Sequence, residues 1–179
     1  YSWANLAAFS NNNFIPGVEQ FAGSGYAGHV AAGIQVFLFT FGARGTVASY
    51  PGATVAFDIW SLMFDVMLRI PIGFAEPYFR VGIGYAWMGQ LDVRELSSSS
   101  VSVYGLTIEG GAGIDLYISD RVSLGAGLDV AFLNLTRQRL DGCMDVGGAM
   151  CNVGGVDFQE EGDAAGFQAR ATGHIAFHF

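Results

Sequence analysis

The sequence predicts an all-β fold, an eight-stranded antiparallel up-and-down transmembrane β-barrel with a polar lumen filled by side chains. Three observations predict it. Of the 179 residues, 51% are hydrophobic and only 13% are charged, against about a quarter charged in soluble domains. Segments of alternating polarity recur along the chain. Short and long connections between them alternate, as turns and loops do in membrane barrels. One domain is expected over residues 1–179.

The composition disfavours membrane-spanning helices. The chain contains 26 glycines, which weaken helices. The one candidate transmembrane helix is the uncharged stretch between Glu19 and Arg44. A helix would spread its polar residues, His29 and Gln35, around different faces, whereas a period of two places both on one side. This stretch is therefore predicted to form strands.

The N-terminal part of the chain supplies five expected strands, at 1–9, 25–36, 38–50, 54–70 and 77–94. The first is aromatic, and because the numbering begins inside it, a processed or clipped N-terminus is expected. In 25–36, Val30, Ala32, Ile34 and Val36 alternate with His29, Ala31, Gly33 and Gln35. In 77–94, apolar odd positions such as Phe79 alternate with Arg80 and small residues.

The C-terminal part supplies three more expected strands, at 101–118, 121–138 and 164–179. The first two carry apolar residues at even positions, and the last carries them at odd positions up to Phe179. The opposite positions hold glycine and single Arg, Asp, Glu or His residues. A water-facing sheet surface would be richer in Lys, Glu and Ser, so a soluble sandwich is less suitable than a barrel with a narrow filled lumen.

The connections also fit a barrel. The expected short turns are at 36–38, 71–77 and 118–121, and the longer polar loops at 10–24, 50–54, 95–100 and 139–163. An even number of strands places both termini on the short-turn side, which in a membrane barrel is the periplasm. Aromatic residues are expected to form two girdles at the membrane interfaces: Trp60, Tyr85, Trp87, Tyr104 and Phe132 near the loops, and Phe39, Phe79, Phe177 and Phe179 near the turns.

Three segments carry a family resemblance: 77–85 (PYFRVGIGY), the glycine-rich strand 105–116, and 173–179 (GHIAFHF). With them the chain resembles the OmpA/OmpX-like outer-membrane β-barrels of Gram-negative bacteria. Ile175, Phe177 and Phe179 look like the C-terminal signal read by the barrel-assembly machinery. The resemblance implies contact with outer-membrane lipids. Its members include structural anchors, adhesins and lipid-modifying enzymes. A peptidoglycan-binding domain is not expected, and neither is the wall-anchoring role of the longer members.

Eight charged residues are expected to point into the lumen: Arg44, Asp65, Arg69, Arg80, Glu109, Asp115, Asp129 and Arg170. Arg44 and Asp65 fall at similar heights, and Arg170, Glu109 and Asp129 form a second group higher up. Unpaired charges in a narrow lumen are costly, so the eight should pair. Such a network could be a gated ion path or a buried acid–base site, but a polar plug that blocks flow is favoured.

No catalytic residues, cofactor or metal site are predicted. His29, His174 and His178 should point inward as hydrogen-bonded residues, because a metal would need three or four converging ligands. No serine lies one or two positions from a histidine at an outer strand end, so no nucleophile–base pair indicates an enzyme.

The loop 139–163 is the most individual feature. A disulfide between Cys143 and Cys151 is favoured over free thiols, given an oxidising compartment. The loop carries six acids and, after Arg139, no basic residue: Asp141, Asp145, Asp157, Glu160, Glu161 and Asp163. It could be a solvated surface, a docking site for a basic partner, or a weak Ca²⁺ or Mg²⁺ site. The net charge of −8 gives no support for binding nucleic acid.

The sequence thus favours a non-catalytic outer-membrane barrel, a structural or surface-interaction protein that presents loop 139–163 to a partner. A small pore and a lipid-modifying barrel enzyme remain the alternatives.

Overall fold

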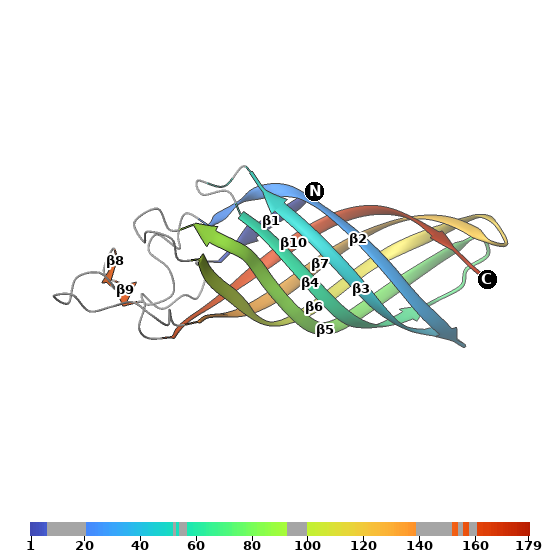
Figure 1. Cartoon of the computed structure of the whole chain (residues 1–179). Coiled ribbons are helices and arrows are strands. Elements are labelled where there is room, and N and C mark those ends of the chain that lie inside the picture. The colour runs from blue at the N-terminus through green and yellow to red at the C-terminus, as the bar shows by residue number, and fades with distance from the viewer. Residues whose placement is uncertain are drawn as a thin grey trace.

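Eight strands close into one antiparallel barrel (Figure 1). The computed structural model describes residues 1–6, 21–51, 53, 57–92, 100–138, 152–153, 156–157 and 161–179. The strands around the ring are β1 (Ser2–Asn5), β2 (Ala22–Val36), β3 (Phe39–Tyr50), β4 (Phe57–Arg69), β5 (Ala75–Asp92), β6 (Ser100–Ser119), β7 (Val122–Arg137) and β10 (Gly162–Phe177). The predicted eight-stranded up-and-down fold is confirmed.

The segment between β7 and β10 contains one feature that the sequence did not predict. Two short strands, β8 (Asn152–Val153) and β9 (Val156–Asp157), pair with each other in a sheet separate from the barrel. They lie beyond the loop end of the barrel (Figure 1).

The register of the ring sets the tilt of the strands. A line of paired residues that leaves β2 at Gln35 returns to β2 at Gly25, ten residues away, after passing Thr40, Met67, Arg80, Gly111, Asp129, Arg170 and Ser2. With eight strands, this shift corresponds to strands tilted by about 40° from the barrel axis. Each residue along a strand therefore advances about 2.5 Å along the axis.

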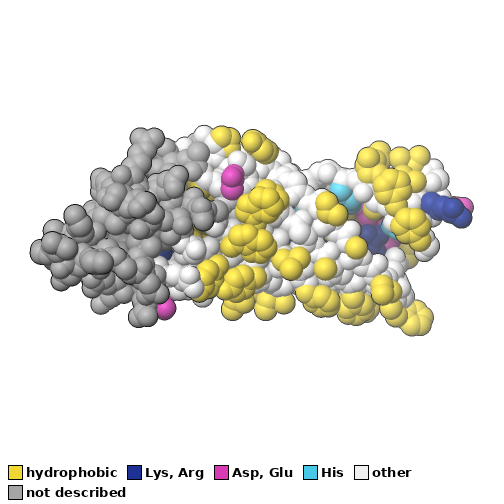
Figure 2. Space-filling view, in the orientation of Figure 1, with side chains coloured by type: hydrophobic (Ala, Val, Ile, Leu, Met, Phe, Trp, Pro, Cys, Tyr) yellow, Lys and Arg dark blue, Asp and Glu magenta, His cyan; other side chains and the backbone are white. Residues whose placement is uncertain are grey.

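The outer wall is apolar because every second side chain of each strand faces outward. Leu62, Phe64, Ile83 and Leu106 are examples of large residues that are more than half exposed. Figure 2 shows hydrophobic side chains distributed over the face of the wall that is in view, with few charges among them. At the loop end of this surface, Trp60 pairs with Trp87, and Trp87 pairs with Tyr104. This row corresponds to the upper aromatic girdle predicted from the sequence.

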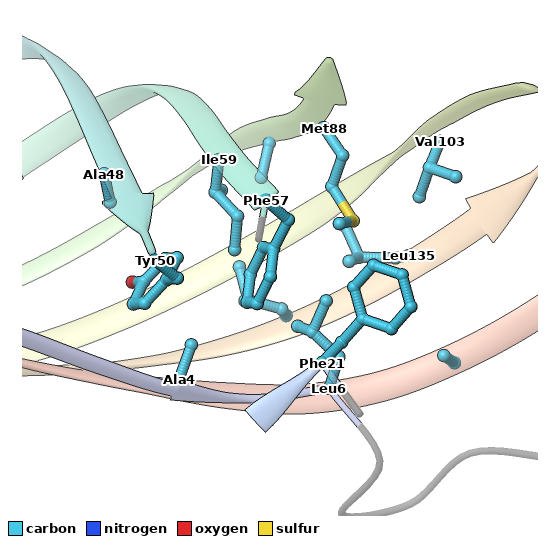
Figure 3. Packing of buried hydrophobic residues seen from close by; sticks show 13 residues of the cluster. Ala4, Leu6, Phe21, Ala48, Tyr50, Phe57, Ile59, Met88, Val103 and Leu135 are labelled. Atoms are coloured by element: carbon cyan, nitrogen blue, oxygen red, sulfur yellow. The ribbon is translucent and has the colours of Figure 1, made fainter. Parts of the chain in front are cut away.

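The interior is not polar throughout, which corrects the predicted polar lumen. Its loop end is filled by an apolar cluster, in which labelled side chains from six strands point toward one another (Figure 3). The apolar cluster consists of Ala4, Leu6, Phe21, Ala48, Tyr50, Phe57, Ile59, Ala86, Met88, Val103, Leu133, Leu135 and Ala164. Near the loops, strands such as β4 and β7 carry large apolar residues on both faces. The inward-facing ones form an apolar core between the polar part of the lumen and the loops.

The turns at the other end are short. Phe37 and Leu38 connect β2 to β3, and Phe37 has a positive φ of 54°. The turn between β4 and β5 ends sooner than the predicted 71–77, because Ala75, Glu76 and Pro77 already pair with β6. Gly73 permits this tight turn with a φ of 63°.

β1 is the shortest strand of the ring. Of the predicted strand 1–9, residues Ser2–Asn5 pair with β2 and β10, and residues 7–9 lie outside the described part. Tyr1 extends the pairing by one residue, since its backbone nitrogen and oxygen both bond to Ala171. The C-terminus lies at the short-turn end (Figure 1). No helix among the described residues is long and apolar enough to cross a membrane.

Candidate functional site

A buried network of six charged side chains occupies the middle of the barrel. Arg44 on β3 donates from Nε to Asp65 Oδ2 (2.7 Å) and from Nη2 to Asp65 Oδ1 (3.1 Å). The same Nη2 donates to Oε1 of Glu109 on β6 at 2.6 Å. The other oxygen of Glu109 accepts a bond from Arg170 on β10. Arg80 on β5 donates to Asp129 and lies 3.6 Å from Glu109 Oε1. We call these six residues the central network.

The central network is balanced and almost completely withdrawn from solvent. Three arginines face three carboxylates, and Arg44 and Glu109 are 1% and 3% exposed. Arg44 joins the two groups that the sequence analysis separated by height, because its guanidinium reaches Asp65 and Glu109 at once. The expected separation into two groups is therefore wrong. Its cause is the stagger of the strands, which brings positions of different sequence height to one level.

A second network lies nearer the short turns. Arg69 Nη2 is 2.9 Å from Asp115 Oδ2, and Arg69 Nη1 is 3.4 Å from Glu76 Oε1. His174 Nε2 is hydrogen-bonded to the other oxygen of Asp115 at 2.7 Å. Tyr117 donates to Glu76 at 2.6 Å. This lower network includes Glu76, which the sequence analysis missed because it assigned residues 71–77 to a turn.

The two networks contain all eight predicted lumen charges, and all eight are buried. Of the three histidines, His174 bonds to Asp115, His178 bonds to Ser123, and His29 lies with its ring 6.4 Å from that of His174. Arg137, fully buried on β7 near the loops, also escaped the sequence analysis, although its odd position in this strand marks it as inward-facing.

Inward glycines provide the space that the charged side chains occupy. A Cβ added at Gly111 would lie 2.1 Å from Asp129 Oδ1 and 2.9 Å from the backbone oxygen of Leu128. One added at Gly125 would lie 2.1 Å from Asp115 Oδ1 and 2.3 Å from His174 Nε2. The many glycines on the polar face of the strands therefore fit the packing of the networks.

We expect Gly111→Ala to destabilise the barrel by about 1–3 kcal/mol, because the new methyl group displaces a carboxylate held by Arg80. Its neighbour Gly110 provides the matched control: it faces outward, and an added Cβ meets nothing within 4 Å. Urea titrations of both variants in the same detergent would compare them. An equal loss in the two variants would contradict the packing role assigned to Gly111.

Above the central network, a polar layer leads to the apolar cluster. The hydroxyl of Tyr50 lies 2.7 Å from Ser2 Oγ and accepts a bond from the Gln168 amide. The ring of Tyr50 is stacked on Phe57, with centroids 4.6 Å apart. Tyr50 thus joins the polar part of the lumen to the apolar part.

The structure brings together one serine–histidine pair that the sequence spacing did not show. Ser123 Oγ and His178 Nε2, 55 residues apart, lie at 3.0 Å near the short turns. Ser123 is fully buried, so its hydroxyl is not open to a substrate carbonyl. Among the described residues, no three His, Cys, Asp or Glu side chains converge as a metal site. A shallow depression lined by Leu62, Phe64 and Ile83 is apolar and lies on the outer wall, away from both networks.

Several predicted residues of loop 139–163 lie outside the described part of the chain. These are Cys143, Cys151, Asp141, Asp145 and Glu160, so the disulfide stays a prediction. Asp157 belongs to β9. Glu161 and Asp163 are exposed at the start of β10, where Asp163 accepts a bond from Thr136 Oγ1 at 2.8 Å. Ile175, Phe177 and Phe179 of the expected assembly signal all face outward and are exposed.

Comparisons with known proteins give one structural likeness. No family model and no curated protein match the chain. The crystal structure of Neisserial surface protein A is similar, with a TM-score of 0.57 and 12% sequence identity over 94% of this chain and 90% of that one. At this identity the likeness concerns the fold, an antiparallel ring of eight strands. Membership in the OmpA/OmpX-like family stays a prediction.

Proposed function

We propose that this chain is a non-catalytic barrel of the bacterial outer membrane that acts as a structural or surface-interaction protein. The outer wall supports the membrane location. From Trp60 to Arg69, β4 advances about 23 Å along the barrel axis, close to the apolar band of about 25 Å that such barrels present. Throughout this interval its outward side chains are uncharged. The likeness to a surface protein of similar fold agrees with this location.

The observation that carries the non-conducting role is the filled interior. Paired charges occupy the middle of the lumen, and the apolar cluster occupies its loop end. An ion crossing the lumen would have to break buried ion pairs and then pass through the apolar cluster, and each step carries a large electrostatic cost. The arrangement favours a plug over the gated path.

We expect the purified barrel to show no steady ionic current in a planar lipid bilayer. The same membrane, tested afterwards with a porin, shows that insertion and detection work. Steady single-channel steps from the barrel alone would replace the plug by the small-pore alternative. Release of fatty acid from phospholipid or lipid A by the barrel would instead revive the enzyme alternative.

The surface-interaction role rests on the acidic segment 139–163. By sequence it concentrates six carboxylates with no basic residue after Arg139. Its described C-terminal end lies at the loop end of the barrel, where Glu161 and Asp163 are exposed. Such a charge concentration favours a basic partner by electrostatic steering. We therefore include in the proposal that this segment docks a basic protein surface outside the membrane.

Cross-linking in intact envelopes, followed by capture and mass spectrometry, tests the docking. The wild type is compared with a variant whose six loop acids are changed to Asn or Gln. We expect a specific cross-linked protein that the variant loses. The control variant carries Asp58→Asn and Asp120→Asn, two exposed acids elsewhere, and should keep it. If neither wild type nor variant captures a protein, the docking role fails and a purely structural barrel remains.

A further inference from the structure

Two of the short turns are apolar at their tips, which is unusual for segments beyond the apolar band of a membrane barrel. The turn between β2 and β3 and the turn between β4 and β5 expose large hydrophobic side chains and no charge. The exposed hydrophobic residues of the two turns are Val36, Phe37, Leu38, Ile70, Ile72 and Phe74. Phe37 is 92% exposed and Phe74 is 72% exposed. We call these residues the apolar tips.

The two turns form one continuous surface. The backbone nitrogen of Arg69, at the end of β4, donates to the oxygen of Leu38 at 2.7 Å, which joins the first turn to the second hairpin. The second turn is closed by bonds between Ile72 and Ala75 and is joined to β6 through Tyr117 and Phe74. Directly above the apolar tips lie the exposed rings of Phe39, Phe41 and Phe79 on the outer wall.

The third short turn differs in chemistry. Asp120 and Arg121 connect β6 to β7, and both are exposed, as is Ser119 at the end of β6. Given the tilt and shift of the strands, the three turns end within roughly two residues of the same height along the axis. The difference between the turns is therefore in the composition of their tips rather than in reach: two tips are apolar, whereas the third carries Asp120 and Arg121 beside the exposed Ile118.

Phe37 adds a second, independent observation. Its φ of 54° lies in the left-handed region, where a residue with a Cβ is strained and glycine or asparagine is favoured. In a two-residue hairpin turn, glycine is the usual residue at this position. The chain instead places there a phenylalanine that is strained and almost fully exposed. Both features are unfavourable in water, and burial of the ring in an apolar phase would offset them.

We infer that the apolar tips insert into the lipid bilayer, so that the β2–β5 side of the barrel sits deeper in the membrane than the side carrying Asp120 and Arg121. This rests on the membrane location proposed above and specifies its lipid contact. The bilayer is favoured over a protein partner because the apolar tips continue the outer wall without a break. The exposed amide of Gln35 beside them donates to the Phe37 carbonyl oxygen at 3.1 Å, so it is bonded within the turn itself.

Paramagnetic broadening of backbone amide signals tests the inference in the isolated barrel. The barrel is placed in nanodiscs of phosphatidylethanolamine and phosphatidylglycerol, with a nitroxide on the lipid chain near the headgroup or with a water-soluble gadolinium chelate. We expect the amides of Phe37, Leu38 and Phe74 to lose signal with the lipid label and to keep it with the chelate. The amides of Asp120 and Arg121 should show the reverse.

Two variants sharpen the comparison. Phe37→Asn keeps a residue that tolerates the left-handed region but removes the ring, and we expect the amide of residue 37 to become accessible to the chelate. Asp120→Asn, a change of similar size in the charged turn, should leave the amides of the apolar tips protected.

The outcomes separate this inference from the proposed membrane location. Leu62 and Ile83, on the outer wall between the Trp60–Trp87 row and the turns, must lose signal to a nitroxide carried on the lipid chain if the barrel spans the membrane at all. If they do so while Phe37, Leu38 and Phe74 lose signal to the chelate, insertion of the apolar tips is wrong and the two turns are open to a protein instead. If Leu62 and Ile83 keep their signals, the membrane location itself is wrong.

Discussion

Glu109→Gln is expected to lower the free energy of unfolding by about 3–5 kcal/mol, the usual cost of removing one partner from a buried ion-pair network. Its two carboxylate oxygens accept bonds from Arg44 and Arg170, and Arg80 lies 3.6 Å away. The amide retains the shape of the side chain but leaves three arginines facing two carboxylates in a buried space. Urea unfolding in phospholipid vesicles, followed by tryptophan fluorescence, measures the loss.

Two comparisons assign that loss to the network. Glu161→Gln makes the same chemical change at an exposed position and should alter stability by less than about 0.5 kcal/mol. Glu109→Gln combined with Arg170→Gln restores the charge balance, and should cost less than the two single changes added together. Strict additivity would show that Glu109 and Arg170 do not act as a pair.

Phe57→Ala is expected to lower the free energy of unfolding by about 3–5 kcal/mol, through lost burial and the cavity it leaves in the apolar cluster. The Phe57 ring is stacked on Tyr50 at 4.6 Å and packs at 5.5 Å against Phe21. The same vesicle assay measures the change.

Phe57→Leu is the matched control, because it retains an apolar side chain of moderate volume and should recover most of the loss. Similar stability of the alanine and leucine variants would mean that the loop end of the lumen is loosely packed. In that case the apolar cluster would no longer be an effective seal, and the non-conducting role would lose its main support.

The periodicity of the sequence determined where the strands lie and which way their side chains point. Tyr104 to Ile118 and Ala165 to Phe179 alternate so regularly that each residue could be assigned to a face, because neighbouring side chains of a strand point to opposite sides. The alternation of short and long connections determined the up-and-down order. For this reason the eight inward charges, from Arg44 to Arg170, were found without a structure.

The sequence shows the inward-facing glycines, but it does not show which side chains occupy the space beside them. Gly111 and Gly125 occur on the polar face of their strands, where a pattern of small residues predicts only a narrow lumen. The structure shows which side chain uses each space, Asp129 in one case and Asp115 with His174 in the other. Those partners come from the neighbouring strands β6, β7 and β10, and their register is fixed only when the sheet closes.

Only the tertiary structure decided which inward residues meet and what fills each part of the lumen. Arg44 reaches Glu109, 65 residues away on a strand that is not its neighbour, and Ser123 on β7 meets His178, which lies 55 residues further along the chain, just after the neighbouring strand β10. Periodicity gives the face of a residue but not its height in the barrel, since the ten-residue shift of the ring moves each strand past the next. Closure of the whole ring fixes the height of each inward side chain. It places the charged side chains in the middle of the lumen and the apolar cluster at its loop end.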